Sequence, residues 1–259
     1  RIATHVRALP LLASPTLSAR VDARVYVVPE CLQLTGSYKI RGALNRILKA
    51  PENVHTIVAY SSGNHAQGVA RAARMCGLRA IIFMPHDAPT LKLERVQADG
   101  AHIVYYDRNR DRPAELARER AAQEGCLFVH PFDDADVIAG NGTVGLNLMT
   151  QAAAMGEMPE VVAIPCSGGG LLAGSALAIH AQQPNADIYA VEPCEWDDYR
   201  QSIERGERMG VAQPTPTLCD ALRNFIPGEL TFPIVRAHVK GGLVVSDSEV
   251  LDAMRFAAL

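Results

Sequence analysis

The 259-residue sequence predicts an α/β protein with two lobes, each built on a parallel sheet flanked by helices. Three observations support this fold class. Short β-branched runs alternate with segments of helical period, which is typical of strands joined by crossover helices. The strand candidates form two apolar groups, one at 56–129 and one from 161 onward. Gly77, Gly100 and Gly125 each stand between a helical segment and a strand, where a left-handed cap favours glycine.

The elements follow one another in the order expected of such a fold. The predicted strands are Val25–Val28, Thr56–Ala59, Ala80–Met84, His102–Tyr106, Val161–Ile164 and Asp187–Val191. Amphipathic stretches between them predict helices at Ala66–Cys76, Pro113–Glu124, Val144–Met155 and Leu171–Gln182. Ser246 and Glu249 form a capping box that predicts a last helix from Asp247. Because nothing follows this partly apolar helix for it to pack against, we expect the full protein to continue beyond it.

Composition and charge exclude several classes of protein. With a net charge of -3 and no cluster of uncompensated Lys and Arg, the sequence predicts no nucleic-acid partner. No run approaches the roughly 20 apolar residues of a membrane span, and no signal-peptide pattern opens the chain. We therefore expect no membrane partner and a cytoplasmic location. The six cysteines lie far apart without a Cys-x-x-Cys pair, which favours reduced, mostly buried thiols.

A single lysine stands among small residues in the run Gly36–Ala43 (GSYKIRGA), at the start of a predicted helix. Burial disfavours the ammonium form, so it would lower the pKa of Lys39 from its usual value of about 10.4. Such an amine can act as a Schiff-base nucleophile or as a base near neutral pH. Taken alone, the run fits a surface lysine at a helix start better than a reactive one.

Two further segments each join a predicted strand to a helix. Ser61–His65 (SSGNH) offers free main-chain N–H groups, two hydroxyls and an amide, which suit a carboxylate. Ser167–Leu171 (SGGGL) has consecutive glycines that let the main chain approach a phosphate closely. Simpler interpretations exist for both, since Ser62 or Asn64 can merely cap a helix and the glycines can serve only a tight turn. The glycine run matches neither nucleotide-binding fingerprint, so a nucleotide is not favoured.

Together, a lysine, a carboxylate-binding turn and a phosphate-binding loop suit an enzyme that uses a phosphorylated aldehyde cofactor to act on an amino acid. Four motifs also resemble, in order and spacing, the serine/threonine dehydratase and serine racemase family of fold-type II pyridoxal-phosphate (PLP) enzymes: ECLQLTGSYKIRGA (Glu30–Ala43), SSGNHAQGVA (Ser61–Ala70), HPFDDADVIAGNGTVGL (His130–Leu146) and SGGGLLAG (Ser167–Gly174). The resemblance implies a two-lobed fold like that of the tryptophan synthase β subunit. It also implies a large cofactor-binding domain at 1–54 and 134–259 and a small domain at 55–133.

The same resemblance implies a role for each site residue. Lys39 would form an aldimine with PLP and remove the substrate α-proton, and Tyr38, where the family usually has Phe, would pack near the cofactor ring. Asn64 would hydrogen-bond the ring hydroxyl. The phosphate would lie on Ser167, Gly168, Gly169, Gly170 and Leu171. The substrate carboxylate would lie on Ser61, Ser62, Gly63, Asn64 and His65. Ser62 would face the substrate from the side opposite Lys39, where a second base permits racemisation.

The segment 192–198 resembles the family's divalent-cation site, with Glu192, the Trp196 carbonyl and Asp198 as ligands. Oxygen donors alone suit Mg²⁺ or Ca²⁺. An acidic surface loop is the simpler interpretation. The chain departs from the family pattern at Cys31, Val28, Pro29, Asn141 and Asn147, outside the lysine and glycine motifs. A later Ser-Gly-Gly-Asn-like turn, which contacts the pyridine nitrogen in the family, is absent from the sequence.

The activity implied by the resemblance is elimination of water from L-threonine or L-serine, a small amino-acid substrate, to give a 2-oxo acid and ammonia. We expect a homo-oligomer, most simply a dimer. Alternatives within the family are a serine or aspartate-type racemase and a 3-hydroxyaspartate dehydratase. Two further alternatives are a β-replacement enzyme of the cysteine synthase type and a non-catalytic amino-acid sensor.

Overall fold

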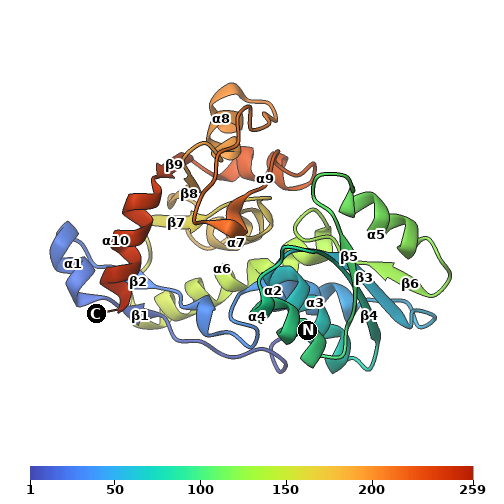
Figure 1. The fold of residues 1–259 in the computed structure, drawn as a ribbon. Helices are drawn as coiled ribbons and strands as arrows, with labels where there is room; N and C mark the ends of the chain where they lie inside the picture. Colours follow the sequence, from blue (N-terminus) through green and yellow to red (C-terminus); the bar gives the residue numbers. More distant parts are fainter. Residues whose placement is uncertain (259) are drawn as a thin grey trace.

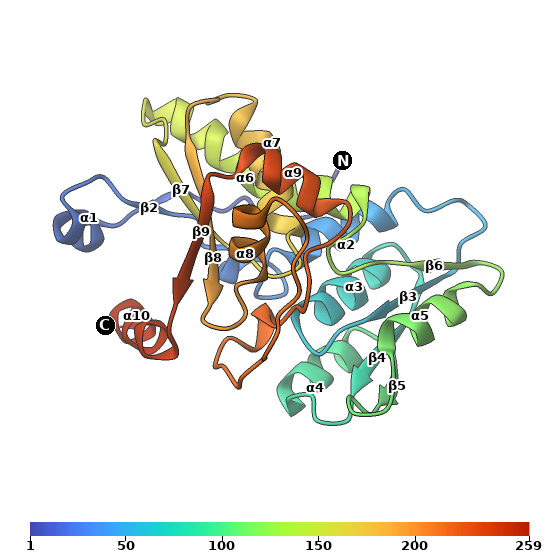
Figure 2. The ribbon, with the colours of Figure 1, turned by 90° about the horizontal axis from the view of Figure 1, so that it is seen from above.

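Two parallel sheets lie on opposite sides of the molecule in the computed structural model, which describes residues 1–258 (Figure 1, Figure 2). One sheet has the strand order β5-β4-β3-β6, and the other has the order β7-β8-β9. A short antiparallel pair, β1-β2, lies near the N-terminus. The strands are β1 (Leu12–Ala13), β2 (Tyr26–Val27), β3 (Thr56–Tyr60), β4 (Arg79–Pro85), β5 (His102–Tyr106), β6 (Cys126–Phe128), β7 (Val161–Pro165), β8 (Asp187–Pro193) and β9 (Gly241–Val245).

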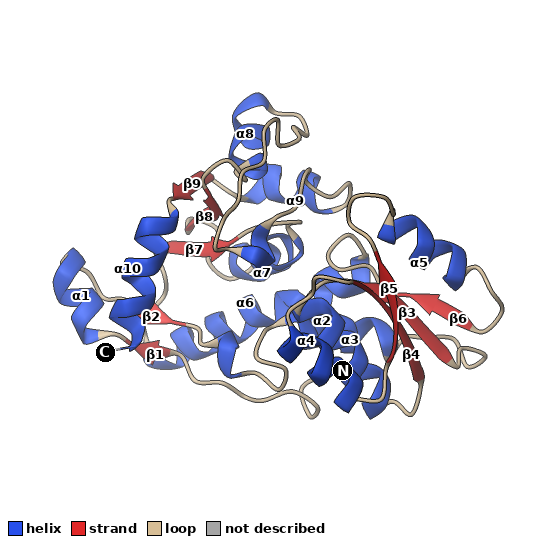
Figure 3. Cartoon of the chain, viewed as in Figure 1, coloured by secondary structure: helices blue, strands red, loops and turns tan. Residues whose placement is uncertain are grey.

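Helices α2, α3, α6 and α7 lie between the two sheets, and α1, α5, α8 and α10 lie on the outside (Figure 3). The helices are α1 (Pro15–Val21), α2 (Lys39–Ile47), α3 (Asn64–Met75), α4 (Thr90–Ala98), α5 (Pro113–Ala121), α6 (Ala135–Met155), α7 (Gly170–His180), α8 (Asp198–Arg205), α9 (Thr231–His238) and α10 (Asp247–Ala258). Two short 3₁₀ turns are η1 (Glu30–Leu32) and η2 (Asp220–Leu222). Within residues 1–258, no helix is both long and apolar enough to cross a membrane.

The predicted α/β fold class with parallel sheets is confirmed. All six predicted strands form, although the run at 25–28 contributes only the two residues of β2. Strand β3 is buried along its first four residues, as expected of a parallel strand covered on both faces. Three strands, β1, β6 and β9, were not predicted, because they are short or begin with glycines that carry no strand signal.

Helix α6 begins nine residues before the predicted start at Val144, at Ala135. The carboxylate of Asp134 caps it by accepting main-chain N–H groups of Asp136 and Val137, each at 2.9 Å. Glycines in this first half, such as Gly140, lower helix propensity and hid it from the sequence pattern. Packing requires them, since a Cβ on Gly140 would lie 2.5 Å from the Arg41 carbonyl oxygen on α2.

The other local predictions are mostly correct. Gly77, Gly100 and Gly125 have φ values of +70°, +80° and +70°, in the left-handed region that favours glycine. The Ser246 N–H donates to the Glu249 carboxylate at 2.8 Å, and the Glu249 N–H donates back to Ser246 Oγ at 3.3 Å, which is the predicted capping box. All six thiols are free, but the expectation that most are buried is wrong, since only Cys166 is buried.

One hydrophobic core joins helices α2 and α3 to the four-stranded sheet, and a second lies around α7, β8 and α9. Ile40 and Leu44 of α2 lie in the first core together with Ile57 of β3. The four-stranded sheet lies within 55–133 and β7-β8-β9 lies within 134–259. The exact division at 1–54, 55–133 and 134–259 stays a prediction, because α2 shares the core of the sheet predicted to lie in the other domain.

Candidate active site

Three helices begin at one cavity of about 420 Å³: α2 at Lys39, α3 at Asn64 and α7 at Gly170. No side chain caps any of the three N-termini. The cavity therefore receives main-chain N–H groups of three first turns and the positive ends of three helix dipoles, although at α2 the Lys39 N–H donates to Ser37 Oγ at 3.4 Å. Every residue predicted for the lysine, carboxylate and phosphate subsites lines it: Tyr38, Lys39, Ser61, Ser62, Gly63, Asn64, His65, Ser167, Gly168, Gly169, Gly170 and Leu171.

The Lys39 ammonium group lies in this cavity without a carboxylate partner among residues 1–258. Its Nζ donates to the carbonyl oxygen of Pro131 at 2.8 Å. Burial lowers the pKa of Lys39 to about 8. The backbone at the start of α2 is fixed by α3, since a Cβ on Gly68 would lie only 3.0 Å from the Lys39 carbonyl carbon. The structure thus places an amine of lowered basicity at a fixed point of the cavity wall.

The lowered pKa of Lys39 predicts how the amine gains reactivity with pH. Below about pH 8 the ammonium form dominates, and above it the neutral, nucleophilic amine does. We expect the rate at which cofactor-free protein captures pyridoxal phosphate to rise through an apparent pKa of about 8 and then level off. Stopped-flow absorbance between pH 6 and 10, corrected for ionisation of the free aldehyde, measures it; a midpoint near the ordinary lysine pKa of about 10.4 contradicts the prediction.

Arg41, two residues along α2, has no part in this reactivity. It is almost fully buried, and its guanidinium donates from Nε and one terminal nitrogen to both oxygens of Glu30, at 2.9 and 2.7 Å. The remaining terminal nitrogen donates to Thr143 Oγ1 at 3.2 Å. This buried ion pair ties η1 and α6 to α2, so Arg41 stabilises the helix that carries Lys39.

The Ser61–His65 turn does not have the simple capping role considered above. Gly63 is the N-cap of α3, and neither Ser62 nor Asn64 caps the helix. Ser61 Oγ accepts the Gly63 N–H at 3.1 Å. His65 Nε2 lies 3.0 Å from the Val129 carbonyl oxygen and so donates to it. Burial lowers the pKa of His65 to about 3, which keeps the ring neutral beside Lys39.

The glycine loop before α7 is shaped by contacts that only glycine permits. Gly169 has φ +87°, and a Cβ there would lie 1.9 Å from the Tyr199 hydroxyl oxygen. A Cβ on Gly168 would lie 2.1 Å from a ring carbon of Phe132. The Gly168 carbonyl accepts hydrogen bonds from Tyr199 Oη at 3.1 Å and Thr231 Oγ1 at 2.9 Å. Because Tyr199 and Thr231 engage the Gly168 carbonyl oxygen, the loop can direct its main-chain N–H groups toward an anion.

Comparison with known proteins assigns the chain to a family. The model of the family described as "pyridoxal-phosphate dependent enzyme" matches residues 2–259. The chain belongs to this family. It is 37% identical to L-threo-3-hydroxyaspartate ammonia-lyase of Saccharomyces cerevisiae, over 100% of this chain and 78% of that protein. It is 39% identical to serine racemase of Oryza sativa subsp. indica, over 98% of this chain and 74% of that protein.

Solved structures of PLP enzymes share the fold. The threonine deaminase of the organism abbreviated T.th. superposes with a TM-score of 0.92 at 43% identity, covering 98% of this chain and 82% of that one. Maize serine racemase superposes with the same TM-score of 0.92 at 36% identity, covering 98% of this chain and 76% of that one. The chain is a fold-type II PLP enzyme with parallel sheets flanked by helices.

The cavity suits pyridoxal phosphate by its own chemistry. An aldehyde needs an amine that loses its proton near neutral pH, and Lys39 is such an amine. A phosphate needs convergent N–H donors, and the first turn of α7 offers them where Gly170, Leu171 and Leu172 are buried and uncapped. A volume of about 420 Å³ lies within the usual range for a cofactor site. Lys39 could therefore hold the aldehyde carbon while α7 holds the phosphate.

The predicted cation ligands lie outside this cavity, around the start of α8. Glu192 is fully buried, and its two oxygens accept the main-chain N–H groups of Tyr199 and Arg200 at 2.9 and 2.8 Å. Both carboxylate oxygens of Asp198 are buried without a hydrogen-bond partner. Burial raises the pKa of Glu192 to about 7 and that of Asp198 to about 8. No three His, Cys, Asp or Glu side chains within residues 1–258 gather as a metal cluster.

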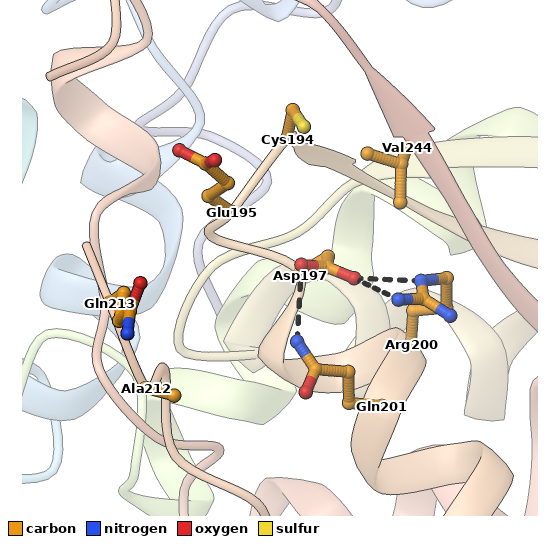
Figure 4. A pocket seen from close by; sticks show the side chains of 8 residues that line it. All are labelled: Cys194, Glu195, Asp197, Arg200, Gln201, Ala212, Gln213 and Val244. Atoms are coloured by element: carbon orange, nitrogen blue, oxygen red, sulfur yellow. Dashed lines mark hydrogen bonds and ion pairs between the residues drawn. The ribbon is translucent and has the colours of Figure 1, made fainter. Parts of the chain in front are cut away.

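A second cavity, of about 520 Å³, lies beside this segment, and it contains neither a lysine nor a glycine loop (Figure 4). Its carboxylate Asp197 is already engaged, because it accepts hydrogen bonds from Arg200 at 2.7 Å and Gln201 at 3.2 Å. Glu195 accepts one from Thr215. The size of this cavity therefore does not make it the reactive site, and the smaller cavity at Lys39 carries the chemistry.

Several residues of the Lys39 cavity were missed by the sequence analysis. Lys92 and Arg108 come from the four-stranded sheet's side, and the segment 220–224 comes from the loop before α9. Tyr199 and Thr231 position the glycine loop from behind. Lys92, Tyr199 and Thr231 lie within helices, and none of the missed residues lies in a glycine-rich run. Arg108 does follow β5, but no glycine or hydroxyl side chain beside it marks a binding turn.

Proposed function

We propose that this PLP enzyme is an ammonia-lyase that eliminates water from a small hydroxy-amino acid, releasing a 2-oxo acid and ammonia. The observation that carries the proposal is the convergence of Lys39 and two uncapped helix N-termini, those of α3 and α7, on one cavity. An amine beside two anion sites suits a substrate with a carboxylate and a cofactor with a phosphate. Relatives named as ammonia-lyases, at 37% and 38% identity, support the reaction class.

Each predicted residue keeps its proposed role at this cavity. Lys39 would hold the cofactor covalently and then, once free, take the substrate α-proton. Ser167, Gly168, Gly169, Gly170 and Leu171 would hold the phosphate, Tyr38 would pack near the ring, and Asn64 would hydrogen-bond the ring hydroxyl. The turn Ser61–His65 would hold the substrate carboxylate. When bound, pyridoxal phosphate supplies the electron sink for the deprotonated substrate.

Ser62 favours racemisation as the second candidate function. Its hydroxyl belongs to the turn at α3, whereas Lys39 comes from α2, so the two can approach a bound substrate from different sides. Relatives named serine racemase, at 39% identity, support this alternative. Racemisation would require one of the two groups, Lys39 or Ser62, to return a proton to the α-carbon on the opposite face. Elimination would require the β-hydroxyl to leave before that proton is returned.

A substrate panel tests the proposed reaction. Holoenzyme is incubated with L-serine, L-threonine and 3-hydroxyaspartate, and ammonia, 2-oxo acid and the chirality of the remaining substrate are measured. We expect ammonia and 2-oxo acid in equal amounts. A product that requires sulfide indicates β-replacement instead. Tight binding of all three without ammonia release or racemisation indicates a sensor and contradicts the proposal.

We further propose that Glu192, the Trp196 carbonyl and Asp198 bind Mg²⁺ or Ca²⁺. The unpartnered, buried oxygens of Asp198 support this, because an ionised carboxylate in such a place needs a cation or a proton. Calcium at a hundredfold excess over its dissociation constant should stabilise the fold by about 2.7 kcal/mol. Asp198→Asn should remove most of that stabilisation, whereas Asp197→Asn, whose parent side chain pairs with Arg200, should retain it. Thermal unfolding with and without each cation measures both variants, and equal responses in the two contradict the assignment.

We also propose a cytoplasmic homodimer. Free thiols at all six cysteines support a reducing compartment. Large apolar side chains exposed on α1, β2 and α10 support an interface: Val21 (57%), Val27 (41%), Leu251 (39%) and Met254 (61%). Sedimentation equilibrium of the holoenzyme decides this point, and a monomer at all concentrations contradicts it.

A further inference from the structure

The Lys39 cavity carries more positive charge than its proposed cofactor and a simple amino acid explain. Besides Lys39, its lining includes three cations, Lys92, Arg108 and Arg223. Its two carboxylates, Glu30 and Asp220, are each paired with a cation within hydrogen-bonding distance. The glycine loop expected to hold the phosphate contains none of these cations. Arg108 pairs with Asp87, which does not line the cavity, so Arg223 is the one of these three cations that makes no ion pair within residues 1–258.

Lys92 is paired with a carboxylate of the cavity itself. Its ammonium group pairs with Asp220 at 2.5 Å, and this pair joins α4 to η2 at the cavity. The same Nζ lies beside the turn at the start of α3, where a Cβ on Gly63 would be 3.1 Å from it. Lys92 therefore sits next to the proposed site of the substrate α-carboxylate. A second substrate carboxylate needs a different partner.

Arg108 and Arg223 are the two guanidinium groups left at the cavity. Arg108 donates only through Nε, to both oxygens of Asp87 at 2.7 and 3.0 Å, so its terminal nitrogens have no hydrogen-bond partner within residues 1–258. In the same range Arg223 makes no ion pair, and its guanidinium lies 5.9 Å from the centre of the Trp196 ring. Hydrogen bonding and charge from Arg108, and more weakly the charge of Arg223, lower the pKa of Asp87.

The position of Arg223 relative to the reacting groups follows from the elements that carry it. The loop 220–224 belongs to the stretch between α8 and α9 and is held at the cavity by the Lys92–Asp220 pair, whereas Lys39 and the Ser61–His65 turn come from α2 and α3. An amino acid whose amine is held at Lys39 and whose α-carboxylate is held at the start of α3 leaves its side chain to the other lining groups, and Arg223 is one of these. A planar guanidinium recognises a carboxylate there by paired, charge-assisted hydrogen bonds.

We propose that Arg223, assisted by Arg108, binds the side-chain carboxylate of the substrate, so that the enzyme prefers dicarboxylic 3-hydroxy-amino acids such as 3-hydroxyaspartate over serine and threonine. This inference rests on the proposed lyase function and names its substrate class. It commits to a dicarboxylic substrate because, among residues 1–258, a neutral hydroxymethyl or hydroxyethyl side chain would leave Arg223 without an ionic partner and the terminal nitrogens of Arg108 without an acceptor.

Kinetics of matched arginine variants test the inference. Wild-type holoenzyme should show a higher kcat/KM for 3-hydroxyaspartate than for L-serine. Arg223→Gln should lower kcat/KM for 3-hydroxyaspartate by about 10- to 100-fold and change that for L-serine by less than about threefold. Arg108→Gln should give a smaller loss in the same direction, and Arg223→Lys should restore part of the preference. Arg205→Gln, at the exposed end of α8 outside both cavities, is the control and should change neither value.

Binding of unreactive amino acids gives a second readout. L-aspartate and L-alanine both lack the leaving hydroxyl and differ by one carboxylate. Calorimetry should show tighter binding of aspartate to wild-type holoenzyme, with the difference lost in Arg223→Gln and weakened by added salt. A wild type that prefers serine, or an Arg223→Gln variant that affects both substrates equally, overturns the inference while leaving the lyase intact. Arginine-dependent aspartate binding without ammonia release from any hydroxy-amino acid overturns the lyase and leaves the carboxylate site.

Discussion

Lys39→Ala is expected to lower turnover by on the order of 10³-fold or more and to abolish the visible absorbance of covalently held cofactor. The variant loses both the only amine that the structure places in the cavity without a carboxylate partner, within residues 1–258, and the proposed proton acceptor. Its fold should survive, because Lys39 makes a single hydrogen bond to the Pro131 carbonyl and no ion pair in that range. Absorbance spectra, ammonia release and thermal unfolding of the same preparations measure all three effects.

Lys49→Ala is the matched control for this variant. Lys49 follows α2, lies outside the cavity and pairs with Asp136 on the surface. Its loss should leave colour and turnover unchanged, since exposed ion pairs contribute little. An added primary amine such as methylamine should restore part of the turnover of Lys39→Ala, because the missing function is that of a base. Full turnover by Lys39→Ala without any added amine would remove the basis of the proposed function.

Gly169→Ala should produce the second largest effect, on stability and on cofactor affinity together. The left-handed φ of +87° costs an L-residue about 1–2 kcal/mol. The new Cβ would also collide with the Tyr199 hydroxyl, and overpacking of this kind costs about 1–3 kcal/mol. Because Tyr199 holds the Gly168 carbonyl, its displacement should move the N–H groups offered to the phosphate. We expect at least a tenfold weaker affinity for pyridoxal phosphate, measured by equilibrium dialysis.

Gly156→Ala separates backbone strain from collision. Gly156 ends α6 with φ +69° and has no atom within 4 Å of an added Cβ. This variant should lose about 1–2 kcal/mol of unfolding free energy and keep its cofactor affinity. If urea unfolding shows equal losses for the two glycine variants, or if Gly169→Ala binds cofactor normally, the role given to the Tyr199 contact is wrong.

The parts of the site that the sequence predicted are those with a local signature. Ser61–His65 and Ser167–Leu171 each stand between a strand and a helix, so their position at the sheet edge follows from the α/β pattern alone. Lys39 was assigned to the same site only through the family resemblance, because the sequence around it, taken alone, predicts a surface lysine. The structure adds the reason for its low pKa, which is burial rather than a neighbouring charge.

The parts that escaped prediction depend on contacts distant in the chain. Tyr199 lies 31 residues from the Gly168 carbonyl that it holds, and Arg223 lies in a loop without regular spacing. The first half of α6 was missed for a related reason, since its glycines weaken the local helix signal in favour of contact with α2. Sequence periodicity reflects the contacts of a residue with its neighbours along the chain. The residues that were missed act through contacts with residues far away in the sequence.

Amine, carboxylate and phosphate are each assigned to the beginning of a different helix; α2 and α3 share one hydrophobic core, and α7 reaches the cavity from the other. Such a division makes the scaffold readily adaptable. Changes in the loop 220–224 can redirect which side chain is accepted without disturbing cofactor capture at α7, whereas changes in α3 also affect Lys39, because α3 packs against the start of α2. Diversification of a library at this loop, with the helix starts held constant, would exploit that independence.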